Sequence, residues 1–303
     1  TQLAKWDDIQ EIYGAGYNGE LPASSTSGTN TSWGPKADDF MFKYFDGEER
    51  PFLMHPNNAS DFFRTGFTTQ NSAILSVNSG KTGMRFRVNT SAGPVDFDFT
   101  ANYTREKVKN RPALGDSQSN VGKNLMTLAG TYDQAWLKHY EDADGNYSNW
   151  NGNDQYNKNP YWDLYKNSNT SDKDVFRFTG KAIWNIDKHL KLQGTIGTDI
   201  NSMNFEDFIA KTTPGTPAGK LTDQIFNNRT LNAEILALYN NSWGDFDVNA
   251  TAGGNIFKVN NKTTTNVGLN QQMNGIQNIM NYQEQNTRES IYKKQISSLY
   301  ASA

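Results

Sequence analysis

The amino-acid sequence predicts an all-β fold, part of a large antiparallel transmembrane β-barrel with long extracellular loops and short periplasmic turns. Three observations predict it. Several segments alternate apolar and polar residues with the period of a β-strand. Short connections between these segments alternate with long polar ones, and no apolar run in the 303 residues reaches the length of a membrane-spanning helix.

The clearest strand pattern lies between Gly93 and Pro112. Apolar residues occupy the odd positions from Val95 to Tyr103, and polar residues occupy the even positions between them. The alternation recurs at 84–90, 176–186, 190–200 and 246–252, more weakly at 231–240, and again from 291 to 303. Each of these strands therefore has one apolar and one polar face.

Two-faced strands of this kind fit a soluble sandwich, with the apolar face in a core, or an outer-membrane barrel, with that face in lipid. For the barrel we expect an outward apolar set: Phe97, Phe99, Tyr103, Phe176, Phe178, Trp184, Phe246 and Val248. The expected inward polar set is Asp96, Asp98, Arg177, Lys181 and Asp247. Burial of the aromatic set in a sealed core would indicate the soluble fold instead.

The connections favour the barrel. Tight ones at 91–94, 187–189 and 241–245 alternate with long polar ones at 104–174, 201–229 and 258–290. Short turns at one end and long loops at the other are typical of outer-membrane barrels, whereas soluble domains rarely repeat such long connections. We therefore expect residues 1–66 to form an extracellular loop region near the start of the barrel. Residues 67–303 would hold the strands, with extracellular loops at about 104–174, 201–229 and 258–290.

Composition excludes several classes of site and partner. The chain has no cysteine, which removes disulfides, thiolate nucleophiles and cysteine metal ligands. The net charge is −3 and the charges are dispersed, so no nucleic-acid partner is expected. No cofactor is expected either.

Six motifs occur in the order in which one transporter family carries them. They are EIYGAGYNG (11–19), SWGPK (32–36), HPNNASDFFRTG (55–66), NSAILSVNSG (71–80), ANYTREKVKNRPALGDS (101–117) and NPYW (159–162). Together they resemble the landmarks of SusC-like TonB-dependent transporters. The resemblance implies a closed outer-membrane barrel in contact with lipid, plugged by an N-terminal domain through which TonB acts. It also implies a SusD-like surface lipoprotein as partner and import of oligosaccharides, or of oligopeptides in some members.

Other landmarks of that family have no counterpart in the sequence, since we find no TonB box, no plug domain and no C-terminal aromatic strand. We therefore expect an internal barrel fragment. Counting strand directions adds a further expectation, because the family places the DFFRTG stretch on the outer side, just before the strand near Ser72 to Asn78. Antiparallel strands reverse direction at each turn. Counting back from the extracellular loop at 104–174 requires the strand near Ser72 to Asn78 to run outward, but a strand that follows an outer stretch runs inward. We therefore predict that one strand and one outer loop are missing between Gly80 and Met84.

Candidate ligand contacts lie in the longest loop, where aromatic residues stand among Asn and Asp. Trp150, Tyr156, Tyr161, Trp162 and Tyr165 form this set. Aromatic faces stack on the apolar faces of sugars while neighbouring amides bond the hydroxyls, so the set predicts carbohydrate binding. Peptide binding and interfacial belts use the same residue types, and these alternatives stay open.

Two further patterns in this loop have simpler explanations. Asp142, Asp144 and Asn146 around Gly145 resemble half of a calcium loop, but the bidentate Glu is missing, and a solvated turn is favoured. Apolar residues recur at helical spacing and predict an amphipathic helix: Leu125, Leu128, Tyr132, Trp136 and Tyr140. Docking of this helix on its own loop is favoured over contact with a lid protein.

The function expected from these observations is transport without covalent chemistry, so the chain is not expected to be an enzyme. The alternative from a different class is a secreted β-rich carbohydrate-binding or hydrolase domain, which would need paired carboxylates converging on a cleft.

Overall fold

The computed structural model describes residues 9–23, 31–63, 75–78, 81–152 and 154–303. Its main feature is a single sheet of eight strands in sequence order, every neighbouring pair antiparallel. The strands are β3 (Leu75–Asn78), β4 (Lys81–Ala92), β5 (Val95–Lys109), β6 (Ser168–Asn185), β7 (Leu190–Ile209), β8 (Lys220–Trp243), β9 (Phe246–Gln271) and β10 (Tyr282–Ser302). The predicted all-β antiparallel fold is confirmed.

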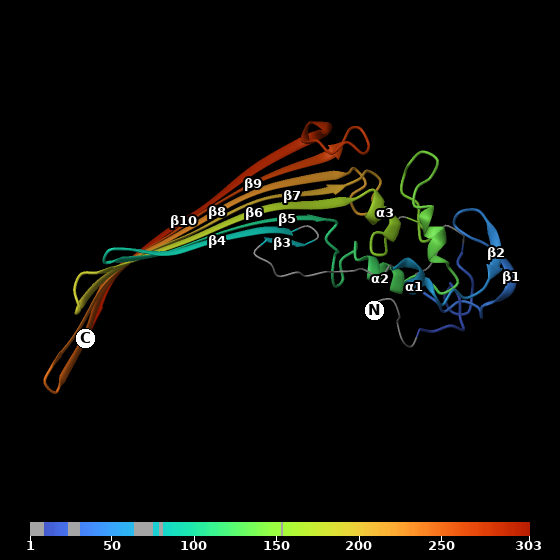
Figure 1. Cartoon of the computed structure of the whole chain (residues 1–303). Helices are drawn as coiled ribbons and strands as arrows, with labels where there is room; N and C mark the ends of the chain where they lie inside the picture. Colours follow the sequence, from blue (N-terminus) through green and yellow to red (C-terminus); the bar gives the residue numbers. More distant parts are fainter. Residues whose placement is uncertain (1–8, 24–30, 64–74, 79–80, 153) are drawn as a thin grey trace.

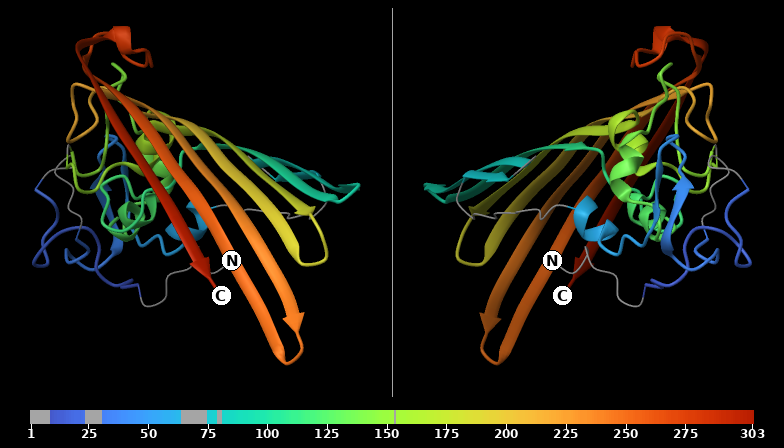
Figure 2. Two further views of the ribbon diagram at one scale, coloured as in Figure 1. Left: turned by 90° about the vertical axis from the view of Figure 1, so that its left-hand side faces the viewer. Right: turned by 90° about the vertical axis from the view of Figure 1, so that its right-hand side faces the viewer.

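The sheet is a long, twisted ribbon of strands with its loops gathered at one end (Figure 1). In the end-on views its two margins, cyan and red, lie far apart, so the described strands form an open curved sheet (Figure 2). The strands lengthen steadily across it, from 12 residues in β4 to 26 in β9. Among the described residues, no helix is both long and apolar enough to cross a membrane.

The pairing register places the apolar residues of neighbouring strands side by side, so that they form a continuous apolar surface. Phe99 pairs with Gly180, which pairs in turn with Ile196 on β7. Two further rows lie on the same face. The first consists of Phe97, Ala182, Gly194, Ile235 and Gly254. The second consists of Val95, Trp184, Leu192, Ala237 and Ala252. Gly180 leaves room for the Phe99 ring, since a Cβ there would lie 3.1 Å from its Cδ1 atom. We call this surface the apolar belt.

The opposite face of the sheet is polar and ion-paired. Arg87 on β4 donates to Asp98 on β5 at 2.8 Å, and Arg177 on β6 donates to Asp199 on β7 at 2.6 Å. None of the eight residues expected on the outward face is buried, and Phe99, Phe176, Trp184 and Phe246 are exposed. A sealed aromatic core of the soluble type is therefore absent from the described sheet.

The short connections follow the prediction. Gly93 and Gly244 have φ values of 59° and 60° at the β4–β5 and β8–β9 turns, a conformation that glycine adopts without strain. At the β6–β7 turn, the Asp187 carboxylate accepts from the backbone amides of His189 and Leu190 at 2.6 and 2.9 Å.

The long connections are shorter than the sequence predicts, at 110–167, 210–219 and 272–281. The strands continue past the alternating segments because backbone pairing persists where both faces have become polar. Arg105 on β5, for example, still pairs with Asp174 on β6 and bonds to Asp172 beside it at 2.7 Å.

The predicted missing strand between Gly80 and Met84 is wrong. Leu75 pairs directly with Met84, and Asn78 with Lys81, so β3 and β4 are antiparallel neighbours with no strand between them. The count of strand directions from the sequence assumed that the chain runs along the sheet only as hydrogen-bonded strands. Residues 64–74 and 79–80, which join these segments, lie outside the described residues.

A loop cap lies beyond one end of the strands. We define it as the described residues between 9 and 63 together with 110–167 and 210–219. It contains a two-stranded sheet of β1 (Asp38–Lys43) and β2 (Glu49–Phe52). Its helices are α1 (Asn58–Phe62), α2 (Val121–Met126), the 3₁₀ helix η1 (Gln134–Lys138) and α3 (Pro160–Tyr165). A second 3₁₀ helix, η2 (Ile279–Asn281), precedes β10.

Candidate ligand-binding cavity in the loop cap

The first core of the cap joins the N-terminal segment to the long loop. Tyr44 and Phe52 from the N-terminal segment pack in one buried cluster with Tyr132, Trp150 and Tyr161 from the loop. The rings of Tyr44 and Tyr132 meet edge to face, with centroids 5.3 Å apart. The cluster fixes two segments that are distant in sequence into one body.

Hydrogen bonds across the same boundary support the packing. The backbone amide of Ala15 donates to Thr131 Oγ1 at 3.0 Å, and that of His55 donates to the Gly130 carbonyl at 2.7 Å. The Asn58 side chain donates to the Tyr132 carbonyl at 2.7 Å. These bonds reinforce the apolar contacts across the boundary, while the buried Tyr132 hydroxyl and Trp150 Nε1 in the same core have no hydrogen-bond partner among the residues that the structure describes.

The second core joins the loop to the ends of the strands. Tyr147 and Trp162 from the loop are buried against Phe208 on β7, Leu221 on β8 and Tyr282 on β10. The indole Nε1 of Trp162 donates to Thr213 Oγ1 in the β7–β8 connection at 2.8 Å. This contact anchors the cap to the strand ends.

The NPYW motif is explained by this arrangement. Asn159 caps α3, since its Oδ1 accepts from the Tyr161 amide at 3.0 Å, and Pro160 takes the first helical position. The Asn159 Nδ2 also donates to the carbonyls of Leu137 and Ser148 at 2.8 and 3.1 Å. The motif therefore orients the helix and places Trp162 in the second core.

Burial separates the five predicted ligand contacts into two groups. Trp150 and Trp162 are 0% exposed and Tyr161 is 7% exposed, so these three rings belong to the two cores and offer no open face to a ligand. Tyr156 and Tyr165 are 59% and 66% exposed and keep accessible rings. The sequence pattern of aromatic residues among amides predicted a binding surface. Three of the five residues instead pack in the two cores of the cap.

The loop at Asp142 is a turn. Its carboxylate Oδ1 accepts from the backbone amides of Asp144 and Asn146 at 3.0 and 2.8 Å, and Glu141 and Tyr147 form a bridge on either side. These bonds hold the pKa of Asp142 below its usual range. In the described part of the chain, no three His, Asp or Glu side chains converge in a way that could hold a metal ion.

The predicted helix between Leu125 and Tyr140 is wrong in extent. The chain forms only α2 and η1 there, because the backbone between them bonds to the N-terminal segment: the Gly130 amide donates to Ser32 Oγ at 3.2 Å, and its carbonyl accepts from the His55 amide at 2.7 Å. A Cβ on Gly130 would lie 2.2 Å from Met54 Cε. The apolar residues at helical spacing pack on Tyr44 and Phe52 of the N-terminal segment as well as on their own loop.

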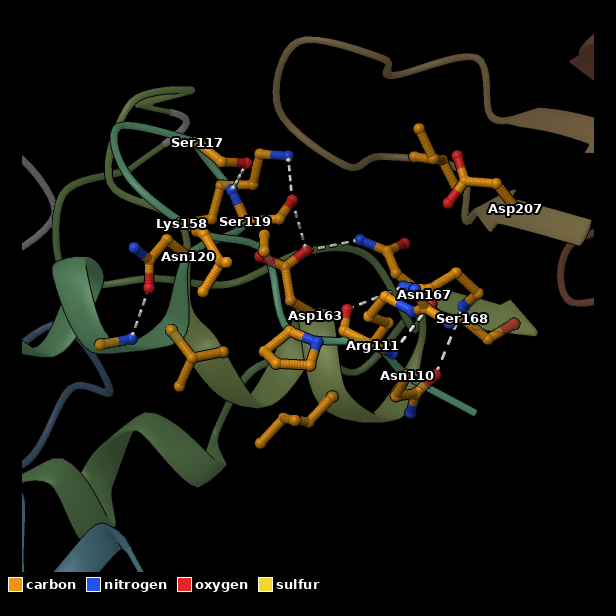
Figure 3. Close-up of a pocket in the computed structure, with 18 of the residues that line it drawn as sticks. Asn110, Arg111, Ser117, Ser119, Asn120, Lys158, Asp163, Asn167, Ser168 and Asp207 are labelled. Atoms are coloured by element: carbon orange, nitrogen blue, oxygen red, sulfur yellow. Dashed lines mark hydrogen bonds between the residues drawn. The ribbon is translucent and has the colours of Figure 1, made fainter. Parts of the chain in front are cut away.

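A cavity of about 650 Å³ lies where the cap meets β5, β6 and β7 (Figure 3). Its polar lining includes Asn110, Arg111, Ser119, Asn120, Lys158, Asp163, Asn167 and Asp207. Its apolar lining includes Phe62, Pro112, Leu114, Leu164, Phe208 and Ile209. The cavity thus combines apolar walls with a few charged groups, as small-molecule sites commonly do.

Asp163 is the central charged group of this cavity. Its Oδ1 accepts from Asn167 Nδ2 at 2.6 Å and from Ser119 Oγ at 3.5 Å, while the shielded Oδ2 has no hydrogen-bond partner in the protein. Burial raises the pKa of Asp163 above its usual range, against the opposing effects of Lys158 and of these two bonds. A carboxylate in this position is costly unless a further donor reaches it.

Two more charged groups complete the interior. Lys158 is only 6% exposed, and its ammonium donates to Ser119 Oγ at 3.3 Å. Asp207 lies at the end of β7, and burial raises its pKa against the opposing charges of Lys220 and Lys158.

The rim of the cavity is held by a left-handed turn and by polar contacts. Asn110 has a φ of 53°, and its side chain accepts from the Asn169 amide at 3.3 Å while Arg111 donates through its backbone amide to Asn169 Oδ1 at 2.8 Å. This pairing continues the β5–β6 ladder into the cavity wall.

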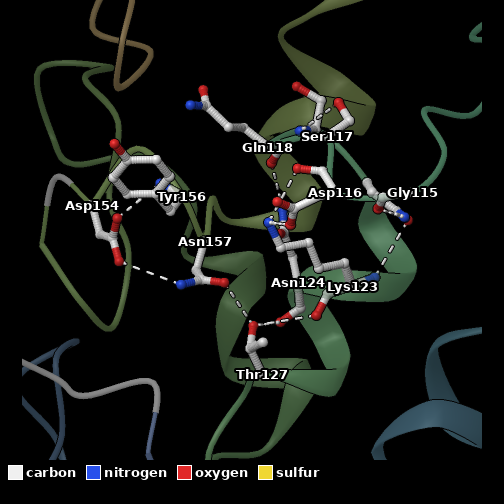
Figure 4. Close-up of polar contacts among 12 residues, drawn as sticks. Gly115, Asp116, Ser117, Gln118, Lys123, Asn124, Thr127, Asp154, Tyr156 and Asn157 are labelled. Carbon is white, nitrogen blue, oxygen red and sulfur yellow. Dashed lines mark hydrogen bonds and ion pairs between the residues drawn. The ribbon is translucent and has the colours of Figure 1, made fainter.

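The loop that carries Tyr156 is tied to α2 by a polar network (Figure 4). Thr127 Oγ1 donates to Asn157 Oδ1 at 2.9 Å, and Asp154 accepts from the Tyr156 amide at 2.8 Å. The Lys123 ammonium pairs with Asp116 at 2.6 Å at the other end of α2. The exposed Tyr156 ring therefore lies next to a residue, Asn157, whose side chain is bonded to the end of α2.

Sequence reasoning missed Lys158, Asp163 and Asp207. Lys158 lies just before α3, Asp163 lies within α3, and Asp207 lies on β7, and no spacing in the sequence brings the three together. Asp163 carries the one weak signal, since it directly follows the NPYW motif.

No protein-family profile matches this chain, and neither does any curated protein sequence. Among solved structures, the RagAB peptide importer in its "closed-closed" state matches with a TM-score of 0.54 and 13% identity. That match covers 77% of this chain and 27% of the other. The "open-open" state matches with a TM-score of 0.54, 13% identity, and coverage of 77% and 26%.

A further RagAB peptide transporter structure matches with a TM-score of 0.51 and 14% identity, covering 75% of this chain and 26% of that one. The chain thus spans about a quarter of the length of the structures it matches. At 13–14% identity the likeness shows a shared fold alone, over a segment of the structures it matches.

Proposed function

We propose that this chain forms part of the barrel wall and outer loops of a SusC-type, TonB-dependent importer of oligomeric nutrients in the outer membrane. The observation that carries the proposal is the apolar belt: register joins the apolar rows of neighbouring strands on one face, opposite an ion-paired face. Such a surface fits lipid on one side and a wet lumen on the other.

The dimensions of the belt agree with this. Along β6 it runs from Phe176 to Trp184, about 26 Å at 3.3 Å per residue. A strand tilt of about 40° converts this length to a height of roughly 20 Å, close to the apolar band of outer-membrane barrels. The polar parts of the longer strands then extend beyond the bilayer and carry the cap.

The cap supports the proposed partners. Ile12, Tyr17, Trp33 and Met41 on its N-terminal segment are each more than half exposed. These exposed apolar side chains on one segment support a protein contact there, and a SusD-like surface lipoprotein is the partner that we propose. TonB would act through a plug domain elsewhere in the whole protein.

For the cargo we favour an oligopeptide over the oligosaccharide that the sequence resemblance implies. The solved structures of similar fold are described as those of a peptide importer or peptide transporter. Burial of Trp150, Tyr161 and Trp162 also removes three of the five rings on which the carbohydrate prediction rested. Tyr156 and Tyr165 support the glycan as a second candidate. We propose no covalent chemistry for either cargo.

Membrane placement is tested with the complete protein. We expect it to fractionate with the outer membrane, to need detergent for solubility, and to migrate faster on gels before heating than after. A protein that stays soluble without detergent would overturn the barrel and favour the secreted carbohydrate-binding or hydrolase domain.

Cargo is tested by uptake in cells that express the complete transporter and its lipoprotein, with and without TonB. We expect TonB-dependent uptake of labelled oligopeptides of several residues. TonB-dependent uptake of oligosaccharides alone would select the second candidate, and uptake of neither would overturn the importer proposal.

A further inference from the structure

We propose that the cavity beside Asp163 binds the primary ammonium group of a ligand that carries an apolar group next to it. A free peptide amino terminus and a lysine side chain share this chemistry. The site is separate from the exposed rings of Tyr156 and Tyr165, and its lining residues come from both the cap and the strand ends.

The first support is the free oxygen of Asp163. Asn167 and Ser119 both bond to Oδ1, which leaves Oδ2 shielded from solvent and without a donor in the protein. A buried carboxylate oxygen without a donor costs free energy that a bound N–H group recovers. Carboxylate oxygens accept most strongly from charged donors such as an ammonium group.

The second support is the balance of charge around the cavity. Asp207 faces Lys220 on the neighbouring strand as well as Lys158, while Asp163 has Lys158 as its opposing charge. Lys158 bonds to Ser119 at 3.3 Å, and no ion pair joins its ammonium to either carboxylate in the described structure. An added ammonium group beside Asp163 would compensate the carboxylate directly.

The third support is the shape and polarity of the walls. Phe62, Pro112, Leu164 and Phe208 line the cavity with apolar surface, and its volume of about 650 Å³ accommodates an amine with a ring or branched chain. A metal ion would need several converging oxygen ligands, which the described residues do not provide. A neutral hydroxyl could reach Oδ2 but would leave its charge uncompensated.

This inference goes beyond the importer proposal and does not depend on it. Binding in the cavity needs only the cap and the ends of β5, β6 and β7, and a soluble protein with the same cap would contain the same site. Direct binding and TonB-dependent uptake can therefore fail independently of each other.

The test is calorimetric titration of the complete purified protein with three probes. Phenylalaninamide carries a free ammonium beside an aromatic ring, N-acetyl-phenylalaninamide has the same ring without the charge, and Nα-acetyl-lysinamide carries the ammonium on its side chain. We expect phenylalaninamide or Nα-acetyl-lysinamide to bind at least tenfold more tightly than N-acetyl-phenylalaninamide. The tighter of the two charged probes identifies an amino terminus or a lysine side chain as the source.

Variants assign the binding to this cavity. D163N keeps the shape and the Asn167 contact but removes the charge, and we expect about ten- to hundredfold weaker binding of the preferred amine. D144N, an exposed carboxylate in the turn near Asp142, is the matched control and should bind as the native protein does. Equal binding of charged and acetylated probes, or native affinity in D163N, would overturn the proposal.

A D163N protein that fails to fold is identified by its protease sensitivity, and K158Q, which leaves the Asp163 charge in place, then serves as the second variant. K158Q should bind the amine at least as tightly as the native protein, and a tenfold loss would overturn the proposal.

Discussion

Trp162 is expected to determine whether the cap stays attached to the strand ends. Its ring is fully buried, meets Tyr147 edge to face at 5.4 Å, and donates to Thr213 Oγ1 at 2.8 Å. Truncation of a buried Trp to Ala costs about 3–5 kcal/mol. W162F keeps an aromatic ring but loses the hydrogen bond and part of the buried area, about 1–2 kcal/mol.

The assay is limited proteolysis of the 110–167 loop in the complete protein, reconstituted in vesicles. Cleavage through a locally opened state follows the population of that state, and each 1.4 kcal/mol raises it about tenfold. W162F should therefore be cut roughly tenfold faster than the native loop, and W162A about a hundredfold faster or more.

The matched control is Y165A, which removes an exposed aromatic ring from the same helix and should leave the cleavage rate within a few-fold of native. Heat-modifiable migration of every variant checks that the barrel itself has folded. Cleavage of W162A at the Y165A rate would refute the assignment of this ring as the anchor of the cap.

Three further predictions concern the belt, the cargo surface and pH. F99K places a charge on the apolar belt and should lower barrel stability in urea titrations by about 2–4 kcal/mol, whereas T100K on the opposite face should cost little; equal losses would contradict the facing. Y156A should weaken cargo binding about tenfold in calorimetry without changing loop proteolysis, and unchanged affinity would remove this ring from the cargo surface. Burial lowers the pKa of His55 despite the opposing charge of Asp133 at 3.6 Å, so the N-terminal segment should be held most firmly above about pH 6.5 and loosen as pH falls below it. Its proteolysis should accelerate between pH 7.5 and 5.5 in the native protein but not in H55Q, and a pH-independent rate in the native protein would exclude this role.

The fold could be predicted where one face of a strand differs from the other. From Val95 to Tyr103 the alternation gave both the strand and its facing, because the belt requires apolar residues at every second position. From Arg105 to Lys109 the alternation of hydrophobicity stops while pairing with β6 continues. Backbone hydrogen bonds between strands do not require alternating side chains, so the sequence pattern does not show where pairing continues. The predicted loops were too long for this reason.

The prediction of a missing strand failed for a related reason. The hydrophobic pattern and the order of the family motifs can place a segment at one end of a sheet. They do not show which strand is hydrogen-bonded to which. The direct pairing of Leu75 with Met84 settles the neighbour of β4, a relation that depends on two segments at once.

The candidate site was the least predictable part because burial, not composition, separates its residues. The cap has short helices and little sheet, so side-chain amides must satisfy many of its backbone groups. Asn159 alone bonds to the backbone of Tyr161, Leu137 and Ser148, and large aromatic rings fill the space between the irregular segments. A cap core of this type therefore has the same composition, aromatics among amides, as a surface that binds sugars or peptides. What distinguishes a binding residue is an open ring, as in Tyr156, or an unsatisfied buried oxygen, as in Asp163, and both properties arise only when the segments are packed.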